Sequence, residues 1–354
     1  GDSRLIPGMQ IPLKLRLYND AGFEQYCTFN LPVGTVSQTT PLGPDEHGYL
    51  IYDVTDTSYP DCPSYDWIEI SPTEGGAGNA LPDISDSGVT WGEGDDLHSK
   101  TLTVLNLPFL FPFYGVLYDR ITVSTNGFIA FGETADGEFR NSTLPGGQGP
   151  APMVAVFWDD LSMSGPSNIY EYYDAAAHLY IIQWDKMRNG YDNETPEVFQ
   201  IILYDPLIYH TGLGDGMIKI QYKVFNNIDV GGFNGNTPLG GNFCTVGIKD
   251  HTNTRGLQYT FNNLYPQAAA PLSHETALLI TTVPADFISA NLQVGGVVIL
   301  EESGDSVIEP GETAEIGIKL KNLGLQTATN VSVSIGGFSP FATFLNSESL
   351  YPDI

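Results

Sequence analysis

The sequence predicts an all-β protein whose centre is a β-sandwich. Short blocks of alternating apolar and polar residues recur along the chain, turn signals rich in Gly and Pro separate them, and helical periodicity is almost absent. The chain has 354 residues, which is enough for two or three domains with hydrophobic cores. The candidate strands are residues 11–19, 26–33, 100–107, 120–125, 127–132, 153–158, 168–174, 178–184, 197–205, 217–225, 243–250, 256–262 and 276–282.

The stretch FPFYGVLYDRITVSTNGFIAFGE, residues 111–133, is expected to form the packed centre of the middle domain. Ile121 and Val123 alternate with Thr and Ser, which gives a strand one buried and one solvated face. Asn126-Gly127 fits a type I′ hairpin turn, in which both central residues take a positive φ. The return strand FIAF is expected to be buried on both faces, with the aromatic residues of FPFY wedged beneath it.

The terminal regions differ in pattern from the centre. In residues 285–354, an apolar run is followed by two alternating segments, residues 314–320 and 331–335, around a Gly-containing turn. This pattern fits the opening half of an immunoglobulin-like (Ig-like) sandwich. Residues 37–284 are then the central β-sandwich domain with an acidic, aromatic leading segment, and residues 1–36 are the closing half of an Ig-like sandwich.

Several motifs resemble known families. The segment GDSVIEPGETAEIGIKLKNLGLQTATNVSVSI closely resembles the Ig-like repeats that follow the catalytic domains of secreted bacterial peptidases, including gingipain-like cysteine peptidases. The layout FPFYG, STNGFIAFG and VAVFWDDL resembles the extracellular nidogen-type β domain. Together these resemblances cover most of the chain and imply a secreted, multi-domain setting. They involve accessory regions, so they imply no catalytic residue.

The order of the two terminal halves suggests how they associate. In the Ig-like repeats, a strand such as LIPGMQIPLKLRLYNDAGFEQYCTFNLPV closes the sandwich and GDSVIEPGE opens it, whereas here the closing part comes first. Residues 1–36 and 285–354 together are close in length to the ~100 residues of one Ig-like domain. We therefore expect them to pair, within one chain or between neighbours, because each alone would leave an unpaired edge.

The charge of the chain limits its partners. The formal net charge is −28, from 42 acidic and 14 basic residues. A nucleic-acid partner is excluded, because few cations are available to replace the counterions around phosphate. No apolar run approaches the ~20 residues of a membrane-spanning helix, so we expect a soluble chain without membrane insertion. The start at Gly-Asp-Ser, without an initiator Met, is expected of an excised mature fragment.

Catalytic motifs are not found in the sequence. It contains no G-x-S-x-G elbow, H-E-x-x-H or P-loop. Cys62 with His47 or His98 could form a nucleophile–base pair, but a loop thiol near two solvated imidazoles is the favoured interpretation. Asp159-Asp160 could belong to a glycosidase pair. We favour a structural role, in which these carboxylates accept backbone N–H groups at the end of a strand.

Acidic loops offer candidate calcium sites, because Ca²⁺ binds several oxygen ligands from flexible segments. None has the spacing of an EF-hand loop, and an acidic turn without metal is favoured at each. The candidate ligands are Asp305, Glu309 and Glu312 in GDSVIEPGE, Glu93, Asp95 and Asp96 in TWGEGDDLH, and Asp53, Asp56 and Asp61 in YDVTDTSYPD.

Aromatic residues cluster in the acidic leading segment: Tyr49, Tyr52, Tyr59, Tyr65, Trp67 and Trp91. Exposed rings could stack on sugars or anchor a protein, and Trp67, Trp91 and Tyr65 are the candidate ligand-binding residues. Buried rings would instead pin this segment to the sandwich. We favour burial, because residues 48–96 contain few aliphatic side chains.

The three cysteines allow either one disulfide or three free thiols. Cys62 lies in a Pro-rich loop, whereas Cys27 and Cys244 lie in strand-like runs. With no C-x-x-C and no His at metal spacing, a zinc site is not expected.

The best interpretation is a non-catalytic accessory region of a secreted or cell-surface bacterial protein whose catalytic part is a peptidase. It would act as a spacer, a stabiliser or an adhesion module, with neighbouring domains of the same polypeptide, a host protein or a glycan as partners. The alternative is a lectin-like domain that binds carbohydrate or glycoprotein, with calcium as a candidate cofactor. A hydrolase is the third, least favoured function.

Overall fold

The computed structural model describes most of the chain, and the chain divides into two units, residues 1–282 and 283–354. The described residues are 6–18, 24–86, 100–163, 165–189, 192–227, 243–283, 292–300, 311, 313–322, 327–334 and 345–354.

Nearly all regular structure in these residues is β, which confirms the all-β prediction. The strands are β1 (Gln10–Tyr18), β2 (Glu24–Pro32), β3 (Tyr49–Asp53), β4 (Asn79–Ala80), β5 (Leu102–Phe113), β6 (Val116–Ser124), β7 (Phe128–Phe131), β8 (Met153–Trp158), β9 (Leu161–Ser162), β10 (Asn168–Asp174), β11 (Leu179–Asn189), β12 (Asp192–Tyr204), β13 (Ile218–Val224), β14 (Thr245–Lys249), β15 (Gly256–Phe261), β16 (Thr276–Thr282), β17 (Leu292–Leu300), β18 (Glu315–Asn322), β19 (Ser332–Ser334) and β20 (Glu348–Leu350). One short 3₁₀ helix, η1 (Pro72–Glu74), lies between β3 and β4.

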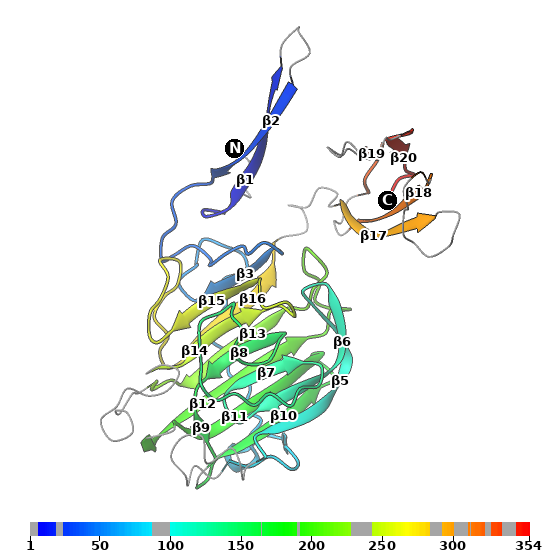
Figure 1. Cartoon of the computed structure of the whole chain (residues 1–354). Helices are drawn as coiled ribbons and strands as arrows, with labels where there is room; N and C mark the ends of the chain where they lie inside the picture. The colour runs from blue at the N-terminus through cyan, green and yellow to red at the C-terminus, as the bar shows by residue number, and fades with distance from the viewer. Residues whose placement is uncertain are drawn as a thin grey trace. The chain divides into compact units, whose positions relative to one another are not determined.

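The centre of the first unit is a sandwich of two antiparallel sheets (Figure 1). The first sheet has the strand order β3-β16-β13-β12-β11-β10-β4, and β9 also pairs with β11. The second sheet has the order β15-β14-β8-β7-β6-β5. Side-chain bonds join the sheets directly: Tyr222 of β13 donates to the Val156 carbonyl of β8 (2.6 Å), Trp184 of β11 donates to the Ser124 carbonyl of β6 (2.8 Å), and Tyr259 of β15 donates to the Asp53 carboxylate of β3 (2.8 Å).

Aromatic side chains fill the space between the sheets. Phe199 of β12 stacks on Phe157 of β8, with ring centroids 5.3 Å apart, and on Trp184 of β11 at 5.1 Å. All three rings are fully buried in one hydrophobic cluster that takes residues from both sheets. Ring pairs at these distances add to the stabilisation that burial provides.

The prediction for FPFYGVLYDRITVSTNGFIAFGE is confirmed for its return strand and its aromatic residues. The solvated face expected for residues 121–124 is wrong, because Thr122 and Ser124 are fully buried. Every residue of β7 is buried, and so are Phe111, Phe113 and Tyr114. Phe131 of β7 lies 5.2 Å from Phe111 and 4.5 Å from Phe113 between ring centroids. The aromatic residues therefore belong to the packed centre and do not line a pocket.

The type I′ turn expected at Asn126-Gly127 is wrong. Of this pair only Gly127 has a positive φ (+71°), and residues 125–127 form the loop between β6 and β7. The Asn126 side chain donates to the Gly137 carbonyl and accepts the Leu161 N–H, so it connects this loop to two others. A Cβ at Gly127 would lie 1.9 Å from the Phe157 carbonyl oxygen, which explains why glycine occupies the position.

Outside the sandwich, the described residues form three two-stranded antiparallel sheets. Strands β1 and β2 pair in the first unit; β17 pairs with β18, and β19 with β20, in the second. The pairing of residues 1–36 with residues 285–354 stays a prediction. In the described part of the chain, no helix has the length and apolar character needed to cross a membrane.

Candidate functional site

Residues 65–74, an extended segment that ends in η1, cross the outer face of the first sheet; we call this segment the strap. It is held by Gln221 of β13, Gln200 of β12 and Gln183 of β11, which are fully buried and lie opposite one another in register. Single glutamines in three strands rich in apolar residues, IKIQYKV, FQIIL and LYIIQW, are the sequence signal that could have indicated this row.

The glutamines bind the backbone of the strap. Gln221 accepts the Asp66 N–H (2.6 Å) and donates to the Asp66 carbonyl (2.8 Å). The Gln200 amide, in the orientation that satisfies its neighbours, donates to the Ile68 carbonyl (3.2 Å) and accepts the Ile68 N–H (3.3 Å). Gln183 accepts the N–H of Ile70, two residues further on (3.2 Å). Every second residue of the strap is thus bound by a different strand: Asp66 by β13, Ile68 by β12 and Ile70 by β11. The spacing is that of an extended chain, in which every second residue faces the same side.

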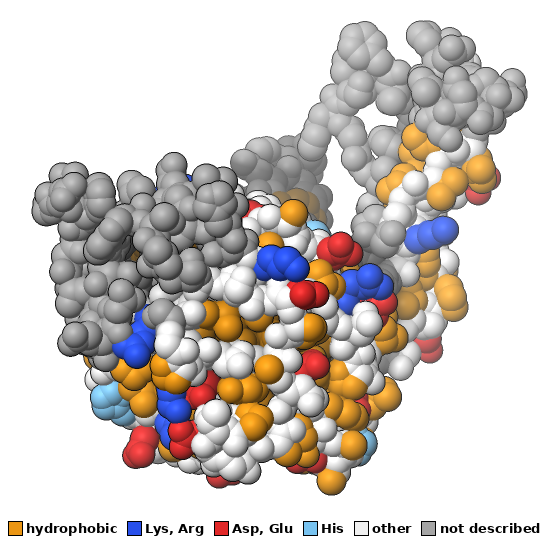
Figure 2. Space-filling model, turned by 90° about the horizontal axis from the view of Figure 1, so that it is seen from below, with side chains coloured by type: hydrophobic (Ala, Val, Ile, Leu, Met, Phe, Trp, Pro, Cys, Tyr) orange, Lys and Arg blue, Asp and Glu red, His pale blue; other side chains and the backbone are white. Residues whose placement is uncertain are grey.

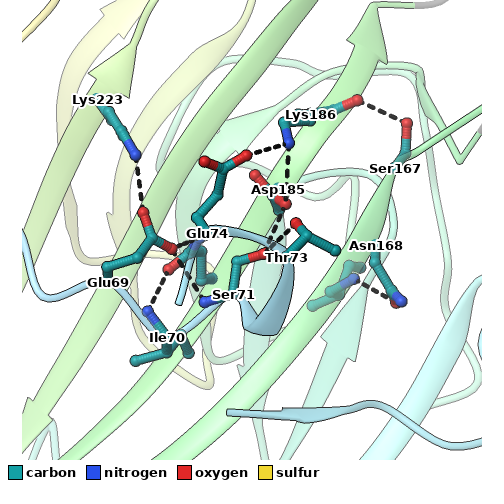
Figure 3. A network of polar contacts seen from close by, with 12 residues as sticks. Glu69, Ile70, Ser71, Thr73, Glu74, Ser167, Asn168, Asp185, Lys186 and Lys223 are labelled. Carbon is teal, nitrogen blue, oxygen red and sulfur yellow. Dashed lines mark hydrogen bonds and ion pairs between the residues drawn. The ribbon is translucent and has the colours of Figure 1, made fainter. Parts of the chain in front are cut away.

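Glu69 is the centre of the polar contacts around the strap (Figure 3). Its Oε2 accepts from Lys223 (2.7 Å) and the Trp67 indole (3.0 Å), and its Oε1 accepts from the Ser71 N–H (2.9 Å) and Gln183 (3.0 Å). Burial alone would raise the pKa of Glu69, but these bonds outweigh it and lower the pKa to about 2. An ionised carboxylate has about four lone-pair sites for hydrogen bonds, and these four donors occupy them.

The end of the strap is fixed by a second carboxylate, on β11. Ser71 donates to Asp185 (3.0 Å), and both residues are buried. The neighbouring Lys186 forms an ion pair with Glu74 of η1 (2.6 Å; Figure 3). Burial raises the pKa of Asp185, against the effect of the Ser71 bond.

Glu69 and Asp185 have pKa values shifted in opposite directions, as in a catalytic acid–base pair. Their partners argue against that function. The oxygens of Glu69 are occupied by four donors of the chain, and Asp185 lies beneath the strap and binds the Ser71 hydroxyl. We therefore interpret both carboxylates as structural: they fix the strap to the sheet.

Of the predicted ligand-binding residues, Tyr65 and Trp67 lie together on the strap. Their ring centroids are 6.4 Å apart with 28° between the planes, and both side chains are partly buried. The Lys223 ammonium lies 5.6 Å from the centre of the Trp67 ring, within range of a cation–π interaction. Trp91 lies outside the described residues, so its role stays a prediction.

The expectation that the leading aromatic residues are buried holds for part of the set. Tyr49 and Tyr52 are buried, whereas Tyr59, like the two rings on the strap, is partly exposed. Burial raises the pKa of Tyr52, and the charges of nearby carboxylates add to this effect.

The acidic loop after β3 shows how the fold binds its carboxylates. Asp53 accepts from Thr55, from the Tyr259 hydroxyl (2.8 Å) and from the Ala270 N–H (3.0 Å), which ties three segments together. Asp56 is fully buried; one of its oxygens accepts the Asp53 N–H (2.9 Å) and the other has no partner. Burial raises the pKa of Asp56 to about 7.

The calcium predictions are not decided. The structure does not describe Asp305, Glu309, Glu312, Asp95 and Asp96. In the part of the chain that it does describe, no group of three or more His, Cys, Asp or Glu side chains could hold a metal ion.

The described residues considered for catalysis have structural partners, and His98 lies outside the described residues. The imidazole of His47 bonds Asp215 (2.7 Å) and is largely buried, so the expectation of a solvated ring is wrong for this residue. Burial and the charges of two aspartates raise the pKa of the free Cys62 thiol, which makes it a weaker nucleophile. Cys244 is free and buried. Asp159 accepts the N–H of the next residue (3.0 Å), as expected at a strand end.

A family model described as NIDO related matches residues 81–288. No solved structure matches the chain. The match agrees with the resemblance of FPFYG, STNGFIAFG and VAVFWDDL to the nidogen-type β domain. It begins after the strap and β4 and includes β5 to β16, so it covers more than half of the chain. The chain therefore belongs to the NIDO-related family.

Proposed function

We propose that the chain is a non-catalytic accessory region of a secreted or cell-surface bacterial protein whose catalytic part is a peptidase. It holds neighbouring domains at a fixed spacing, stabilises them, or adheres to a partner. Membership of the NIDO-related family supports the non-catalytic part of this proposal. The resemblance of residues 304–335 to peptidase-associated repeats supports the peptidase part.

One observation carries the proposal: the polar side chains around the strap and at the candidate catalytic His47 bind other groups of the same chain. Glu69 binds four donors, His47 binds Asp215, and Asp53 joins three segments. Polar networks with all members satisfied make a fold rigid. The face seen in Figure 2 mixes hydrophobic, acidic, basic and uncharged side chains, as a solvated surface does.

The test compares the full-length protein with a variant that lacks residues 37–284. We expect hydrolysis of a small chromogenic peptide to stay within about twofold per folded molecule, while the melting temperature of the remaining protein or its retention at the cell surface falls. Hydrolysis of protein, peptide or glycan substrates by the isolated chain would overturn the proposal. A secreted location is checked by protease treatment of intact cells, which should degrade the protein.

A second function, binding of a carbohydrate or glycoprotein, is favoured by Tyr65 and Trp67. Two nearly parallel, partly exposed rings can stack on a sugar, and Glu69 and Lys223 lie beside them. A glycan and glycoprotein array should then show binding that Trp67→Ala and Tyr65→Ala abolish. Tyr173→Ala, which removes an exposed ring from β10, should leave binding unchanged. A repeat with chelator reports whether calcium takes part.

A further inference from the structure

Two neighbouring residues of the first sheet each bury a polar atom that lacks a hydrogen-bond partner. In the described part of the chain, neither Oγ of Ser162 on β9 nor Nε of Arg188 on β11 has a partner. Ser162 is 2 % exposed, and Arg188 is partly exposed. Buried nitrogen and oxygen atoms of side chains are nearly always hydrogen-bonded in folded proteins. Two such atoms in one place therefore indicate a partner that comes from outside the protein.

The strand pairing places the two side chains on the same face of the sheet. Ser162 lies directly opposite Arg188 in the antiparallel β9–β11 pair, where Cβ atoms are about 5 Å apart. The preceding residues, Leu161 and Met187, belong to the core between the sheets. Because side chains alternate along a strand, Ser162 and Arg188 point to the outer face, the one that the strap crosses.

The charge of Arg188 is not balanced by a neighbouring carboxylate. The other arginine side chains that the structure describes, Arg120, Arg140 and Arg255, each form an ion pair with an acidic side chain. Arg188 forms no ion pair with a described residue, although the chain has 42 acidic and 14 basic residues. A buried nitrogen of a charged group without an acceptor is costly. The missing partner is therefore expected to be an anion, because a water molecule would leave the charge unbalanced.

The donors at this place fit an oxyanion. The N–H groups of a guanidinium form a fork that matches two oxygens of a carboxylate, sulfate or phosphate. The Ser162 hydroxyl can donate a further bond to the same group. Gly165 is exposed beside the fork, and a Cβ there would lie 3.8 Å from Nη2 of Arg188. A longer side chain at that position would cover the guanidinium, whereas glycine leaves it open to a ligand.

We propose that Ser162 and Arg188 form a binding site for an oxyanion, that is, for a carboxylate, sulfate or phosphate group. Arg188 supplies the charge and the fork of donors, and Ser162 supplies the donor beneath it. The oxyanion is either a free ion or the acidic substituent of a glycan. The site involves neither Tyr65 nor Trp67, so it does not depend on the sugar binding considered for those rings.

NMR titration of the arginine Nε–H signals in the intact chain tests the proposal. Sodium sulfate, phosphate and acetate are each added up to about 100 mM, about a hundredfold above a millimolar dissociation constant. Sodium chloride at the same ionic strength is the reference. We expect the Arg188 signal, assigned by its loss in Arg188→Lys, to shift and saturate with an oxyanion. The Arg120 signal is the internal control, because this guanidinium already pairs with Asp119.

Ser162→Ala should weaken the binding of the oxyanion about tenfold, as for the loss of a hydrogen bond to a charged group. It should not lower the melting temperature of the anion-free protein, because the hydroxyl that it deletes has no partner among the described residues. Ser142→Ala, at a serine between β7 and β8, should leave the affinity unchanged.

The proposal is wrong if no oxyanion shifts the Arg188 signal more than chloride does, since water then completes the two atoms. It is also wrong if Ser162→Ala binds the oxyanion as tightly as the wild type. A sulfated disaccharide and a disaccharide with a glucuronate residue distinguish the two sources of the group. Tighter binding of either than of the free ion supports a glycan as the ligand, and equal binding supports the free ion.

Discussion

Replacing Asp56 with Asn should stabilise the protein at pH 8 and leave its stability at pH 4 nearly unchanged. Asp56 is fully buried, one of its oxygens has no partner, and the carboxylate of Asp53 lies close by. The asparagine carbonyl keeps the bond from the Asp53 N–H, and its amide group takes the place of the unpartnered oxygen without a charge.

The magnitude follows from the pKa. Burial raises the pKa of Asp56 from 3.8 to about 7, so the folded protein holds this proton more tightly than the unfolded chain does. The free energy of unfolding therefore falls as pH rises from about 4 to 7, by up to about 4 kcal/mol at 1.36 kcal/mol for each pH unit of difference. Above pH 7 the free energy of unfolding of the wild type has lost this full amount. The Asp56→Asn protein loses none of it, because asparagine does not titrate.

Urea unfolding followed by tryptophan fluorescence between pH 4 and pH 8 measures the effect. The difference between Asp56→Asn and wild type should grow with pH and level off above pH 7. The matched control is Asp83→Asn, at a side chain that is 84 % exposed, where we expect less than about 0.5 kcal/mol at every pH. An Asp56→Asn protein that is less stable than wild type at pH 8, or a difference independent of pH, would refute the reasoning.

Three further substitutions test other parts of the structure. Gln200→Leu leaves the N–H and carbonyl of Ile68 unpaired beneath the strap and should lower the free energy of unfolding by about 2 kcal/mol or more. Limited proteolysis of this variant should cut the strap before it cuts the sandwich. Cleavage of the strap at the same rate in the wild type would contradict this prediction. Lys249→Met removes the buried ammonium that donates to three backbone carbonyl groups (2.6–3.1 Å) and should lower the unfolding free energy by about 3 kcal/mol; an unchanged urea midpoint would show that water replaces it. Gly127→Ala forces a Cβ to within 1.9 Å of the Phe157 carbonyl oxygen and should destabilise by more than about 3 kcal/mol in calorimetry, whereas Gly147→Ala, where a Cβ meets open space, should not.

The strands and the core could be predicted because local patterns determine them. The apolar residues Ile121 and Val123 and the apolar run FIAF are enough to place β6 and β7 and to bury Phe128 and Phe131. The alternation did not predict that Thr122 and Ser124 are buried as well, because that depends on what packs against the second face. The turn between them was mispredicted because Asn126 bonds loops that are distant in sequence. The contacts that Asn126 makes with these loops determine the conformation of the turn, and the preference of the Asn-Gly pair for a type I′ turn does not.

The strap could be predicted only in part. Its aromatic residues indicated a segment attached to the sandwich, and the structure places Tyr65 and Trp67 side by side there. The way it is held was not foreseen, because the row of glutamines depends on the register of β11, β12 and β13. A glutamine in one strand is unremarkable, and only the pairing of the strands shows that Gln183, Gln200 and Gln221 form a row.

The way the glutamines hold the strap has a consequence for how this protein can evolve. They bind its main-chain N–H and carbonyl groups, which every residue type except proline provides, and the strap precedes the region that the family model matches. Side chains such as those of Tyr65 and Trp67 can therefore be exchanged while the strap stays docked. Related proteins could acquire new surface chemistry here without altering the scaffold, and an engineer could graft short binding sequences at the same place.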